Sequence, residues 1–500
     1  MATKKNPIDS LVSYFSPSAG FKRAQARAAL DIVSKARSYE GAAKGRRTAG
    51  WKTFGTDANA ETNAALSTLR NRSRDLVRNN GYATKAVQVL VENTIGTGIM
   101  AKPSGSAKGR VTTANDLWKN WAESLDCDFD GLHDFYGLQS LIFRSLVEGG
   151  DVLVRRVRTS YDSQEIPIQL QVLEGDYLDV NKNSIAPGQN TRIVQGVEFD
   201  AAGKKVAYWL FDKHPGDSTR YHSLVSKRYL AEDIIHLYRV DRAGQVRGVP
   251  WGAAAIMTLR DFDEYEDAQL IRQKIAACFA AFVYDQEPPS ELGNGKLSID
   301  KVEPGIIETL PPGKDIKFAS PPSVDGYSDY SRITLRKVAA SYGVTYESLT
   351  GDYSNVNFSS GRMGWLEFQR ALDAWRWRIV IPRLCQPTWK WFAQAADLKG
   401  TNLTGVSPMW TPPRREMIDP SKEIAANSLA IRNGFKSLPE VIREDGSDPT
   451  EVMQEIADSN KTLDKLGIVL DSDPRNVSKG GMTQQDKVIE AQSQNSGGNE

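Results

Sequence analysis

The sequence has few cysteines and histidines, which limits the chemistry that it can support. Only three of its 500 residues are cysteines, and Cys127, Cys278 and Cys385 are far apart without paired spacing. They suggest neither a disulfide framework nor a zinc site, and a reducing cytoplasm is the expected place of synthesis. The four histidines are equally scattered, and no Gly-x-Ser-x-Gly motif supports a catalytic serine. We therefore expect no enzyme activity, no metal and no cofactor.

Long apolar runs and nucleotide-binding motifs are also missing. The longest apolar run, residues 275–283, is much shorter than the roughly 20 residues that cross a bilayer, and no signal-peptide pattern opens the sequence. We expect no membrane association. The pattern Gly-x-x-x-x-Gly-Lys-Ser/Thr does not occur, so the chain itself is not expected to be a nucleotide-driven motor.

Net charge is small, although the charges are unevenly distributed. The formal charge is +1 at pH 7, whereas proteins that bind DNA tightly collect Lys and Arg to displace counterions from phosphate. Residues 1–50 hold ten Lys and Arg against three Asp and Glu, and residues 437–500 hold six against thirteen. Both ends are read as solvated segments, with contacts to DNA or to another assembly protein as the alternative. The tail 478–500 is expected to be disordered.

Hydrophobic periodicity predicts an α+β protein that is mainly helical. Helices are expected over residues 62–95 with a break at Asn79-Asn80-Gly81, and over 112–125 and 137–148. After residue 148 the sequence changes to short β-rich runs with turn residues between them. These runs are 152–157, 168–173, 193–199, 206–211 and 234–238. A strand-rich subdomain after helices gives the α+β class.

Two helices around a small module are the most distinctive prediction. No proline occurs between Pro250 and Pro288, so about 31 residues, 253–283, are expected to form one helix about 46 Å long with an apolar stripe. A second helix is expected over 327–342. Two β-like runs between the helices, 305–310 and 315–318, indicate a small α/β module.

A polar stretch follows the second helix. Residues 343–361 have no sustained period and predict a long loop, of the kind that is usually functional or mobile. A Trp-rich helix is expected over 362–394, interrupted at Pro382 and Pro387. Its helical spacing favours core or subunit packing of the tryptophans over a stacking platform for single-stranded nucleic acid. Basic residues that flank the loop are either phosphate contacts or ordinary surface residues: Arg332, Arg336, Lys337 and Arg362.

Two acidic clusters invite a metal-site interpretation. Residues 126–131 reproduce the first half of an EF-hand loop, but the twelfth position, where calcium needs a bidentate Glu, is Gly137. An acidic turn between helices is favoured. Five acidic residues of the long helix would suit a two-metal site, yet neighbouring helical positions point in different directions. An acidic helix face, or a functional acidic lining, is favoured for Asp261, Asp263, Glu264, Glu266 and Asp267.

An ordered series of short motifs carries a resemblance to a known family. The motifs are Arg74-Asp-Leu-Val-Arg-Asn-Asn80, Asn93-Thr-Ile-Gly-Thr-Gly98, Asp128-x-Asp130-Gly131, Glu148-Gly-Gly-Asp151, Leu173-Glu-Gly-Asp176, His236-Leu-Tyr-Arg239, Gln245-Val-Arg-Gly-Val-Pro-Trp251, Leu310-Pro-Pro-Gly313 and Leu349-Thr-Gly-Asp-Tyr-Ser-Asn-Val-Asn-Phe-Ser-Ser360. Together they resemble the lambda-type portal proteins of tailed phages. The resemblance extends from about Leu66 to Phe392.

The resemblance implies a ring, usually of twelve subunits, at one capsid vertex of the virion. Double-stranded DNA would pass through this ring during packaging and ejection. The implied partners are further copies of the chain, the terminase large subunit, a head-completion or connector protein, and the major capsid and scaffold proteins. Two other classes stay open, namely a virion adaptor protein that never encloses DNA and a metal-dependent DNA-processing enzyme.

The resemblance also implies a division of the chain and a set of site residues. The division is a basic N-terminal segment 1–60, wing 61–250, first stem helix 251–285, clip 286–325, second stem helix 326–343, tunnel loop 344–361, wing helix and return 362–419, crown-like helices 420–477 and a disordered tail 478–500. The predicted DNA-facing loop residues are Asp352, Tyr353, Asn355, Asn357 and Arg362. The predicted stem lining is Asp263, Glu266, Arg336 and Lys337. Because DNA must slide, we expect a channel wall that is not strongly basic.

Overall fold

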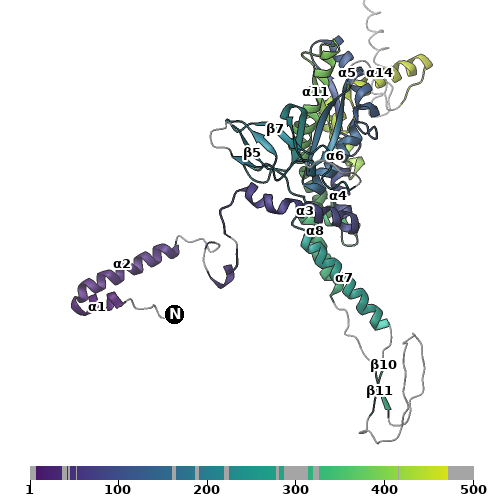
Figure 1. Ribbon diagram of the computed structural model, residues 1–500. Helices are drawn as coiled ribbons and strands as arrows, with labels where there is room; N and C mark the ends of the chain where they lie inside the picture. The colour runs from purple at the N-terminus through teal and green to yellow at the C-terminus, as the bar shows by residue number, and fades with distance from the viewer. Residues whose placement is uncertain are drawn as a thin grey trace, which may run out of the picture. The chain divides into compact units, whose positions relative to one another are not determined.

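The computed structural model describes residues 7–36, 42, 45–51, 53–159, 165–185, 191–218, 225–277, 281–285, 314–318, 326–414 and 416–470. The predicted tail 478–500 lies outside these residues. The chain divides into two compact units, Met1–Asp57 and Ala58–Glu500. The first unit contains α1 (Pro7–Phe15) and α2 (Pro17–Ala36), which Figure 1 shows at its N-terminal end.

Four helices open the second unit and match the predicted ones closely. They are α3 (Ala58–Asn79), α4 (Gly81–Thr94), α5 (Lys108–Ala122) and α6 (Phe135–Gly149). Asn80 causes the break between the first two, because its extended backbone ends α3 and its side-chain oxygen accepts the Ala83 N–H at 2.9 Å as the cap of α4. Gly150 ends α6 with φ 90°, and a Cβ there would lie 2.3 Å from the Val249 carbonyl carbon.

Two antiparallel sheets follow the helices. The first has the order β3 (Ile168–Glu174), β2 (Asp151–Arg158), β9 (Ile234–Tyr238). The second runs β4 (Ser184–Ile185), β5 (Arg192–Val194), β6 (Val197–Phe199), β7 (Lys205–Leu210), β8 (Lys227–Leu230). The single predicted strand 193–199 was wrong, because Gln195 and Gly196 take φ of 50° and 82° and turn it into the β5–β6 hairpin. A third pair, β1 (Met100–Ser104) with β12 (Ser407–Thr411), was not predicted.

The central strand β2 is buried on both faces and therefore joins two cores. Val152 and Val154 belong to the large core under the helices, whereas Leu153 belongs to the smaller core beneath the five-stranded sheet. The alternation follows from the two-residue period of a strand. The helices, the three-stranded sheet and the five-stranded sheet thus form successive layers, and the α+β, mainly helical class is confirmed.

Aromatic residues fill the large core. Trp118 lies 5.0 Å from the ring centroids of both Trp389 and Phe392, and Trp391 is also buried. Core packing is therefore confirmed for Trp389 and Trp391. Trp377 in the same helical run is 55% exposed.

The helix that carries these tryptophans is continuous through both prolines. It consists of α10 (Phe358–Trp375), a π-helical segment Arg376–Cys385 and α11 (Gln386–Leu398). The predicted interruption was wrong for two physical reasons. Pro382 lies in the π-helical segment, where hydrogen bonds run to the fifth residue back, as from the Gln386 N–H to the Ile381 carbonyl. Pro387 lies directly after that bond, where the π-helical pattern changes to the α-helical one and the donor that proline lacks falls at the change of pattern.

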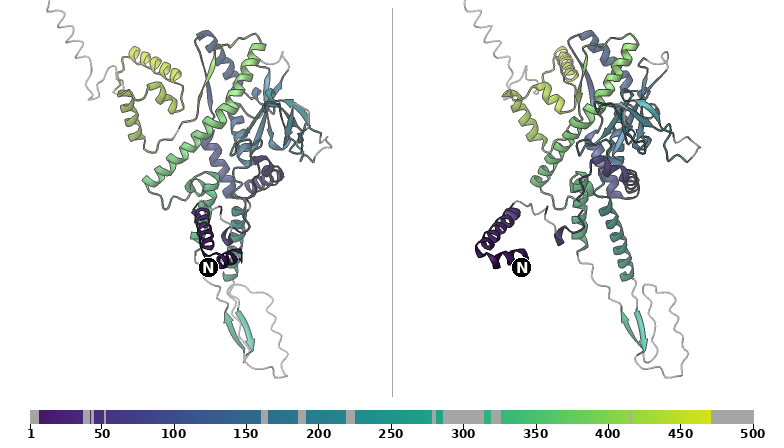
Figure 2. Two further views of the ribbon diagram at one scale, coloured as in Figure 1. Left: turned by 90° about the vertical axis from the view of Figure 1, so that its left-hand side faces the viewer. Right: turned by 60° about the vertical axis from the view of Figure 1, so that its left-hand side comes forward.

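A pair of helices leads away from the layered region toward a two-stranded ribbon, as both views of Figure 2 show in teal. They are α7 (Ile256–Ala277) and α8 (Tyr327–Tyr342), and the ribbon pairs β10 (Ala281–Asp285) with β11 (Lys314–Phe318). The second helix was predicted correctly. The predicted helix 253–283 was too long, because the aromatic and β-branched residues Phe282, Val283 and Tyr284 pair across the ribbon as a strand. The predicted run 305–310 lies outside the described residues.

Three further helices and four short 3₁₀ turns complete the described chain. The helices are α12 (Pro420–Arg432), α13 (Leu438–Glu444) and α14 (Pro449–Leu466). The 3₁₀ turns are Arg46–Thr48, Leu125–Cys127, Gly175–Tyr177 and Ala231–Asp233. Within the described residues, no helix has both the length and the apolar character needed to cross a membrane.

Candidate functional site

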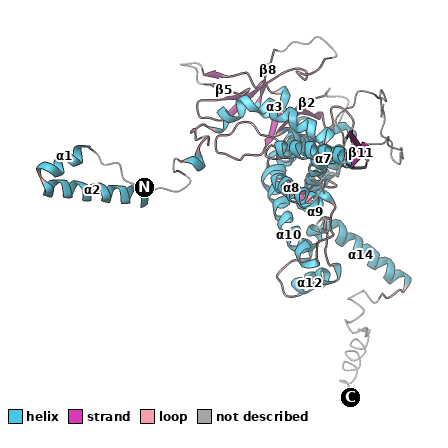
Figure 3. Ribbon diagram, turned by 90° about the horizontal axis from the view of Figure 1, so that it is seen from below, coloured by secondary structure: helices cyan, strands magenta, loops and turns pink. Residues whose placement is uncertain are grey.

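The polar stretch after α8 is partly helical. Gly343 ends α8 with φ 77°, and its N–H donates to the carbonyls of Ala339 and Ala340. The short helix α9 (Tyr346–Thr350) follows, with Thr345 as its cap. Gly351 then begins the irregular segment 351–357, which we call the 351–357 loop. The predicted loop 343–361 was therefore too long at both ends, because polar capping residues begin α9 and α10 inside it. Figure 3 shows α8, α9 and α10 following one another.

Asp352 holds the shape of the 351–357 loop. One carboxylate oxygen accepts the Ser354 backbone N–H at 3.0 Å and the Ser354 hydroxyl at 2.6 Å, and the other accepts the Tyr346 hydroxyl at 3.1 Å. The Ser354 bonds, followed by the Tyr346 bond, lower the pKa of Asp352, and the charge of Arg332 adds to the effect. The carboxylate is therefore ionised at neutral pH and stabilises the turn.

The other predicted loop residues divide into supporting and outward-facing side chains. Asn357 supports, because its side-chain oxygen accepts the Ser360 N–H at 2.8 Å and caps α10. Tyr353 is 63% exposed, and Asn355 and Arg362 are also exposed. These three side chains give a surface of aromatic, amide and single basic character. Such a surface suits brief contacts with phosphate and base edges rather than tight binding.

The four predicted stem residues do not converge on one place. Half-buried Asp263 accepts the Asn80 side-chain amide at 2.7 Å, and half-buried Glu266 accepts the Tyr327 hydroxyl at 3.2 Å. Burial is the largest effect that raises the pKa of each of these carboxyl groups. Both therefore contact their own subunit. Arg336 and Lys337 are exposed on α8, and the Arg336 guanidinium lies 5.4 Å from the centre of the Tyr346 ring.

The two acidic clusters use their carboxylates for local contacts. The Asp128 carboxylate accepts backbone N–H groups of Asp130, Leu132 and His133 at 3.2, 2.9 and 3.0 Å, as an acidic turn does. On α7, Asp261, Glu264 and Asp267 are exposed, and Glu264 pairs with Arg260 at 3.1 Å. These three match the predicted acidic helix face, whereas the other two acidic residues of the cluster are half-buried.

A buried charge cluster that the sequence reasoning missed joins the helices to both sheets. Asp151 at the start of β2 is fully buried and accepts Arg70 of α3 at 2.8 Å, Arg247 by its Nε, and His236 of β9 at 3.3 Å. Arg247 also donates to the Gly175 carbonyl at 2.6 Å. The motifs around Asp151, His236 and Arg247 were a signal for these three residues, but spacing alone could not bring them together.

The charge states in this cluster follow from burial and from its two guanidinium groups. Burial alone would raise the pKa of Asp151, but Arg247 and Arg70 overcome that effect and hold it well below its usual range. Burial lowers the pKa of His236 to about 3 despite its contact with Asp151. The imidazole is therefore neutral at physiological pH, and the cluster is an ion-paired structural joint.

One neighbouring group has the composition of a metal site. Within the described residues, ligand atoms of Glu174, Asp176 and His214 lie within 4.8 Å of one another. However, Arg74 donates to Glu174 at 2.8 Å and to Asp176 at 2.6 Å, so a guanidinium already occupies the position between the two carboxylates. The residues fit an ion-pair cluster better than a cation site.

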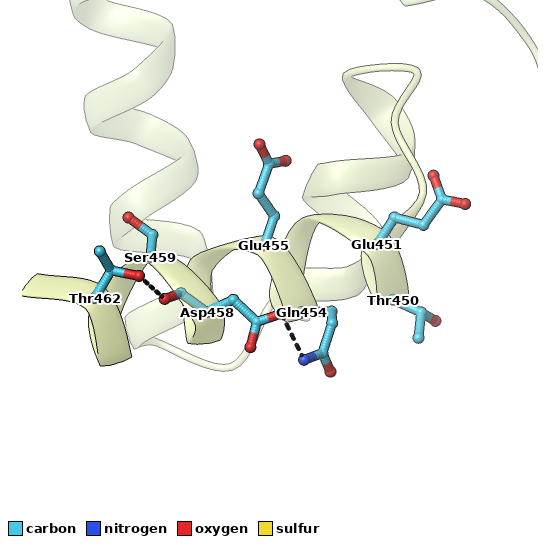
Figure 4. Close-up of a pocket in the computed structure, with 7 residues that line it drawn as sticks. All are labelled: Thr450, Glu451, Gln454, Glu455, Asp458, Ser459 and Thr462. Carbon is cyan, nitrogen blue, oxygen red and sulfur yellow. Dashed lines mark hydrogen bonds between the residues drawn. The ribbon is translucent and has the colours of Figure 1, made fainter.

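A shallow acidic groove runs along α14 (Figure 4). Its side chains bond along the helix itself, since Gln454 donates to the Asp458 carboxylate at 3.0 Å and Thr462 donates to the Asp458 carbonyl at 2.9 Å. Glu451 and Glu455 add to its negative charge. A polyanion such as DNA is repelled by this surface.

Comparison with known proteins places the chain in a family. The family described as phage portal protein, lambda family, matches residues 44–376, and the chain belongs to it. The probable portal protein of Halomonas phage phiHAP-1 is 27% identical over 80% of this chain and 81% of its own length. The portal protein of Escherichia phage N15 is 22% identical over 83% and 88%, and portal protein B of Escherichia phage lambda is 21% identical over 76% and 81%. The resemblance indicated by the motifs is confirmed.

Solved structures are more distant in sequence. A chain from the neck of a native gene transfer agent particle has a TM-score of 0.45 and 16% identity, covering 75% of this chain and 94% of that one. An HK97-family phage portal protein from Corynebacterium diphtheriae has a TM-score of 0.31 and 14% identity, covering 75% and 99%.

Proposed function

We propose that this portal-family chain forms a ring at one vertex of a phage capsid and conducts double-stranded DNA during packaging and ejection. The observation that carries the proposal is the family match, which spans the layered region, both helices α7 and α8, and the 351–357 loop. In this proposal the layers form the wing, α7 and α8 the stem, β10 and β11 part of the clip, and α12 to α14 the crown. The chain works in the virion after synthesis in the bacterial host.

The proposed DNA contact is the 351–357 loop with the first turns of α10. Tyr353, Asn355 and Arg362 are the outward-facing side chains, whereas Asp352 and Asn357 hold the loop in shape. A single basic residue beside neutral polar groups supports transient contact, because each additional phosphate pair would strengthen binding and resist sliding. The predicted stem lining by Asp263, Glu266, Arg336 and Lys337 stays a prediction.

The proposed partners follow from this position at the vertex. The ring would dock the terminase large subunit during packaging and then a head-completion or connector protein. During assembly it would contact the major capsid and scaffold proteins. Nucleotide hydrolysis that drives the DNA is assigned to the motor, because the sequence has no Gly-x-x-x-x-Gly-Lys-Ser/Thr pattern.

The test of the ring is direct. Purified full-length protein is examined by negative-stain microscopy and by mass measurement of the intact particle. Annular particles with a central hole, whose mass is a multiple of the 55.3 kDa subunit, are the expected result. A stable monomer or dimer under all assembly conditions would contradict the proposal and favour an adaptor protein.

A further inference from the structure

The helix α7 presents an exposed face that is acidic. From Met257 to Ile271 one set of exposed positions recurs every three or four residues, as one side of a helix does. Exposed Leu270 lies outside this set, and exposed Lys274 follows one turn beyond it. Their charges are three carboxylates and one guanidinium, and Arg260 already pairs with Glu264. Asp261 and Asp267 are the carboxylates that this pair does not neutralise. We call this surface the acidic α7 face: Met257, Arg260, Asp261, Glu264, Asp267, Ala268 and Ile271.

The helix α8 presents an exposed face of the opposite sign. Its one carboxylate, Asp329, is paired with Arg332. Arg336 and Lys337 are therefore the dominant charges of this face. We call it the basic α8 face: Asp329, Ile333, Arg336, Lys337 and Ala340.

Each face also exposes large apolar side chains among its charges. Met257 and Ile271 are each 57% exposed on α7, and Ile333 is 66% exposed on α8. Apolar groups surrounded by charged ones are typical of protein interfaces, in which the apolar centre is buried and the charged rim sets the partner. Packing against another protein surface removes these apolar side chains from water, which contact with the phosphates of DNA would not do.

The two faces cannot meet within one subunit. Within a subunit, α7 and α8 already pack against each other through Tyr265, whose ring centre lies 4.4 Å from that of Tyr330, and through the Tyr327 hydroxyl, which donates to Glu266 at 3.2 Å. The charged side chains of the acidic and basic faces are not part of this contact. A second copy of the chain can therefore supply their partners.

We propose that the acidic α7 face of one copy packs against the basic α8 face of the next copy. Pairing either face with itself would oppose like charges, whereas pairing α7 with α8 opposes Asp261 and Asp267 with Arg336 and Lys337. A contact between two different surfaces of one chain is heterologous, and repetition of it by a fixed rotation closes a ring. The inference rests on the proposed ring and identifies a contact that holds it together. It places Arg336 and Lys337 between subunits, in place of their predicted position in the stem lining.

Paired charge reversals test this contact. One full-length variant carries Asp261→Lys with Asp267→Lys, and a second carries Arg336→Glu with Lys337→Glu. Each reversal opposes like charges at every interface, so each is expected to reduce the ring fraction at least fivefold at low salt, as measured by mass photometry. A chain with all four substitutions restores opposite charges and is expected to recover rings.

Mixing the two non-assembling variants gives a sharper result. In an equimolar mixture, the lysine-bearing α7 of one variant meets the glutamate-bearing α8 of the other, and the unchanged faces also oppose opposite charges. Alternating rings with an even number of subunits are therefore expected. Rings from the mixture but not from either component alone would also show that both variants are folded.

Controls separate this inference from the ring itself. Exposed Lys108 and Lys119 of α5 lie away from both faces, and Lys108→Glu with Lys119→Glu is expected to leave ring formation unchanged. Rings in the wild type that tolerate both reversals would overturn the α7–α8 contact and leave the ring proposal intact. Absence of rings in the wild type would instead overturn the ring proposal.

If a charge-reversal variant fails to fold, a disulfide crosslink tests the contact between α7 and α8 of neighbouring copies instead. Tyr265 lies beside Tyr330 in one subunit, so residues 261 and 333 lie at similar heights along the two helices. A chain with Asp261→Cys and Ile333→Cys is expected to give a series of covalent oligomers on oxidation, when Cys278→Ser is added and the buried Cys127 and Cys385 are kept. On the same background, either added cysteine alone is expected to give dimers at most. Dimers alone from the double variant would contradict the contact.

Discussion

Asp151 shows how much a single buried carboxylate can determine in this protein. It lies at the first position of β2, where the helical layer, the three-stranded sheet and the segment containing Arg247 meet. Two guanidinium groups and one carboxylate share a space without water access, so each depends on the others to offset its loss of hydration. The residue therefore sets the packing of three elements at once.

Substitution of Asp151 by Asn is expected to lower the free energy of unfolding by about 3–5 kcal/mol, because two buried guanidinium groups lose their counter-charge. Chemical denaturation followed by tryptophan fluorescence measures the effect. Glu174→Gln is the control, since that carboxylate is 49% exposed in its pair with Arg74 and its loss is expected to cost less than about 1 kcal/mol. Equal losses of unfolding free energy in the two variants would contradict the role of the Asp151 cluster as a structural joint.

His236 predicts a dependence of stability on pH. Its pKa falls from 6.5 to about 3 on folding, so below pH 6.5 the unfolded chain binds a proton that the folded chain does not. Stability from this residue is thus complete above pH 6.5 and decreases as pH falls toward 3. Between pH 7 and pH 5 the loss is about 2 kcal/mol, at about 1.4 kcal/mol for each pH unit below 6.5.

Thermal unfolding between pH 7 and pH 5 measures this dependence. A His236→Gln variant keeps a side chain able to donate to Asp151 but cannot be protonated, so its midpoint is expected to change less over this range than that of the wild type. Parallel curves for the two proteins would show that His236 is not responsible.

At the scale of elements, the junction between α3 and α4 connects the layered region to α7. Asn80 caps α4 with its oxygen and donates its amide to Asp263, so one side chain serves two helices. Among the residues that the structure describes, the side chain of its neighbour Asn79 bonds only along its own helix, to Asp75 at 2.8 Å. Adjacent asparagines in the same turn therefore have very different roles.

Asn80→Ala is expected to lower the free energy of unfolding by about 1–2 kcal/mol, because the cap of α4 is lost and the half-buried Asp263 loses its donor. Asn79→Ala is the matched control and is expected to change stability by less than about 0.5 kcal/mol. Denaturant titration of the three proteins compares them. A larger loss of stability for Asn79→Ala than for Asn80→Ala would contradict the assignment of Asn80 as the cap of α4.

At the scale of the whole molecule, the near-neutral charge is consistent with the proposed passage of DNA. The 500 residues carry a formal charge of +1, and the loop proposed to face DNA has one basic residue nearby. Packaging requires DNA to be held in place laterally yet to move lengthwise. Weak contacts meet both requirements, because the affinity for phosphate rises steeply with each added cation.

Tyr353→Lys with Asn355→Lys adds two cations to each subunit's loop. Rings are expected to form normally, whereas the amount of DNA packaged by assembled capsids with their motor is expected to fall several-fold, most strongly at low salt. Asn355→Gln is the neutral control. Normal packaging by the lysine variant would indicate that the loop does not approach DNA.

The sequence by itself determined much of the local structure. Periodicity predicted α3 to α6 and α8, because amphipathic stripes and capping residues act within a few positions. Prediction from periodicity failed where contacts with distant residues overrode the local sequence pattern. Phe282 to Tyr284 became a strand through pairing with β11, and Pro382 was accommodated by a π-helical segment inside a long helix. Neither outcome can be read from neighbouring residues.

The candidate site, too, was predicted from the sequence only in part. Tyr353, Asn355 and Arg362 were predicted from the sequence and are exposed, whereas only the tertiary structure turned Asp263 and Glu266 toward their own subunit. The Asp151 cluster depends on residues up to 96 positions away from Asp151, which only the folded chain brings within hydrogen-bonding distance of it. Composition determined that the molecule carries little net charge. The fold decided where opposite charges face each other, because the side of a helix that remains exposed depends on what covers the other side.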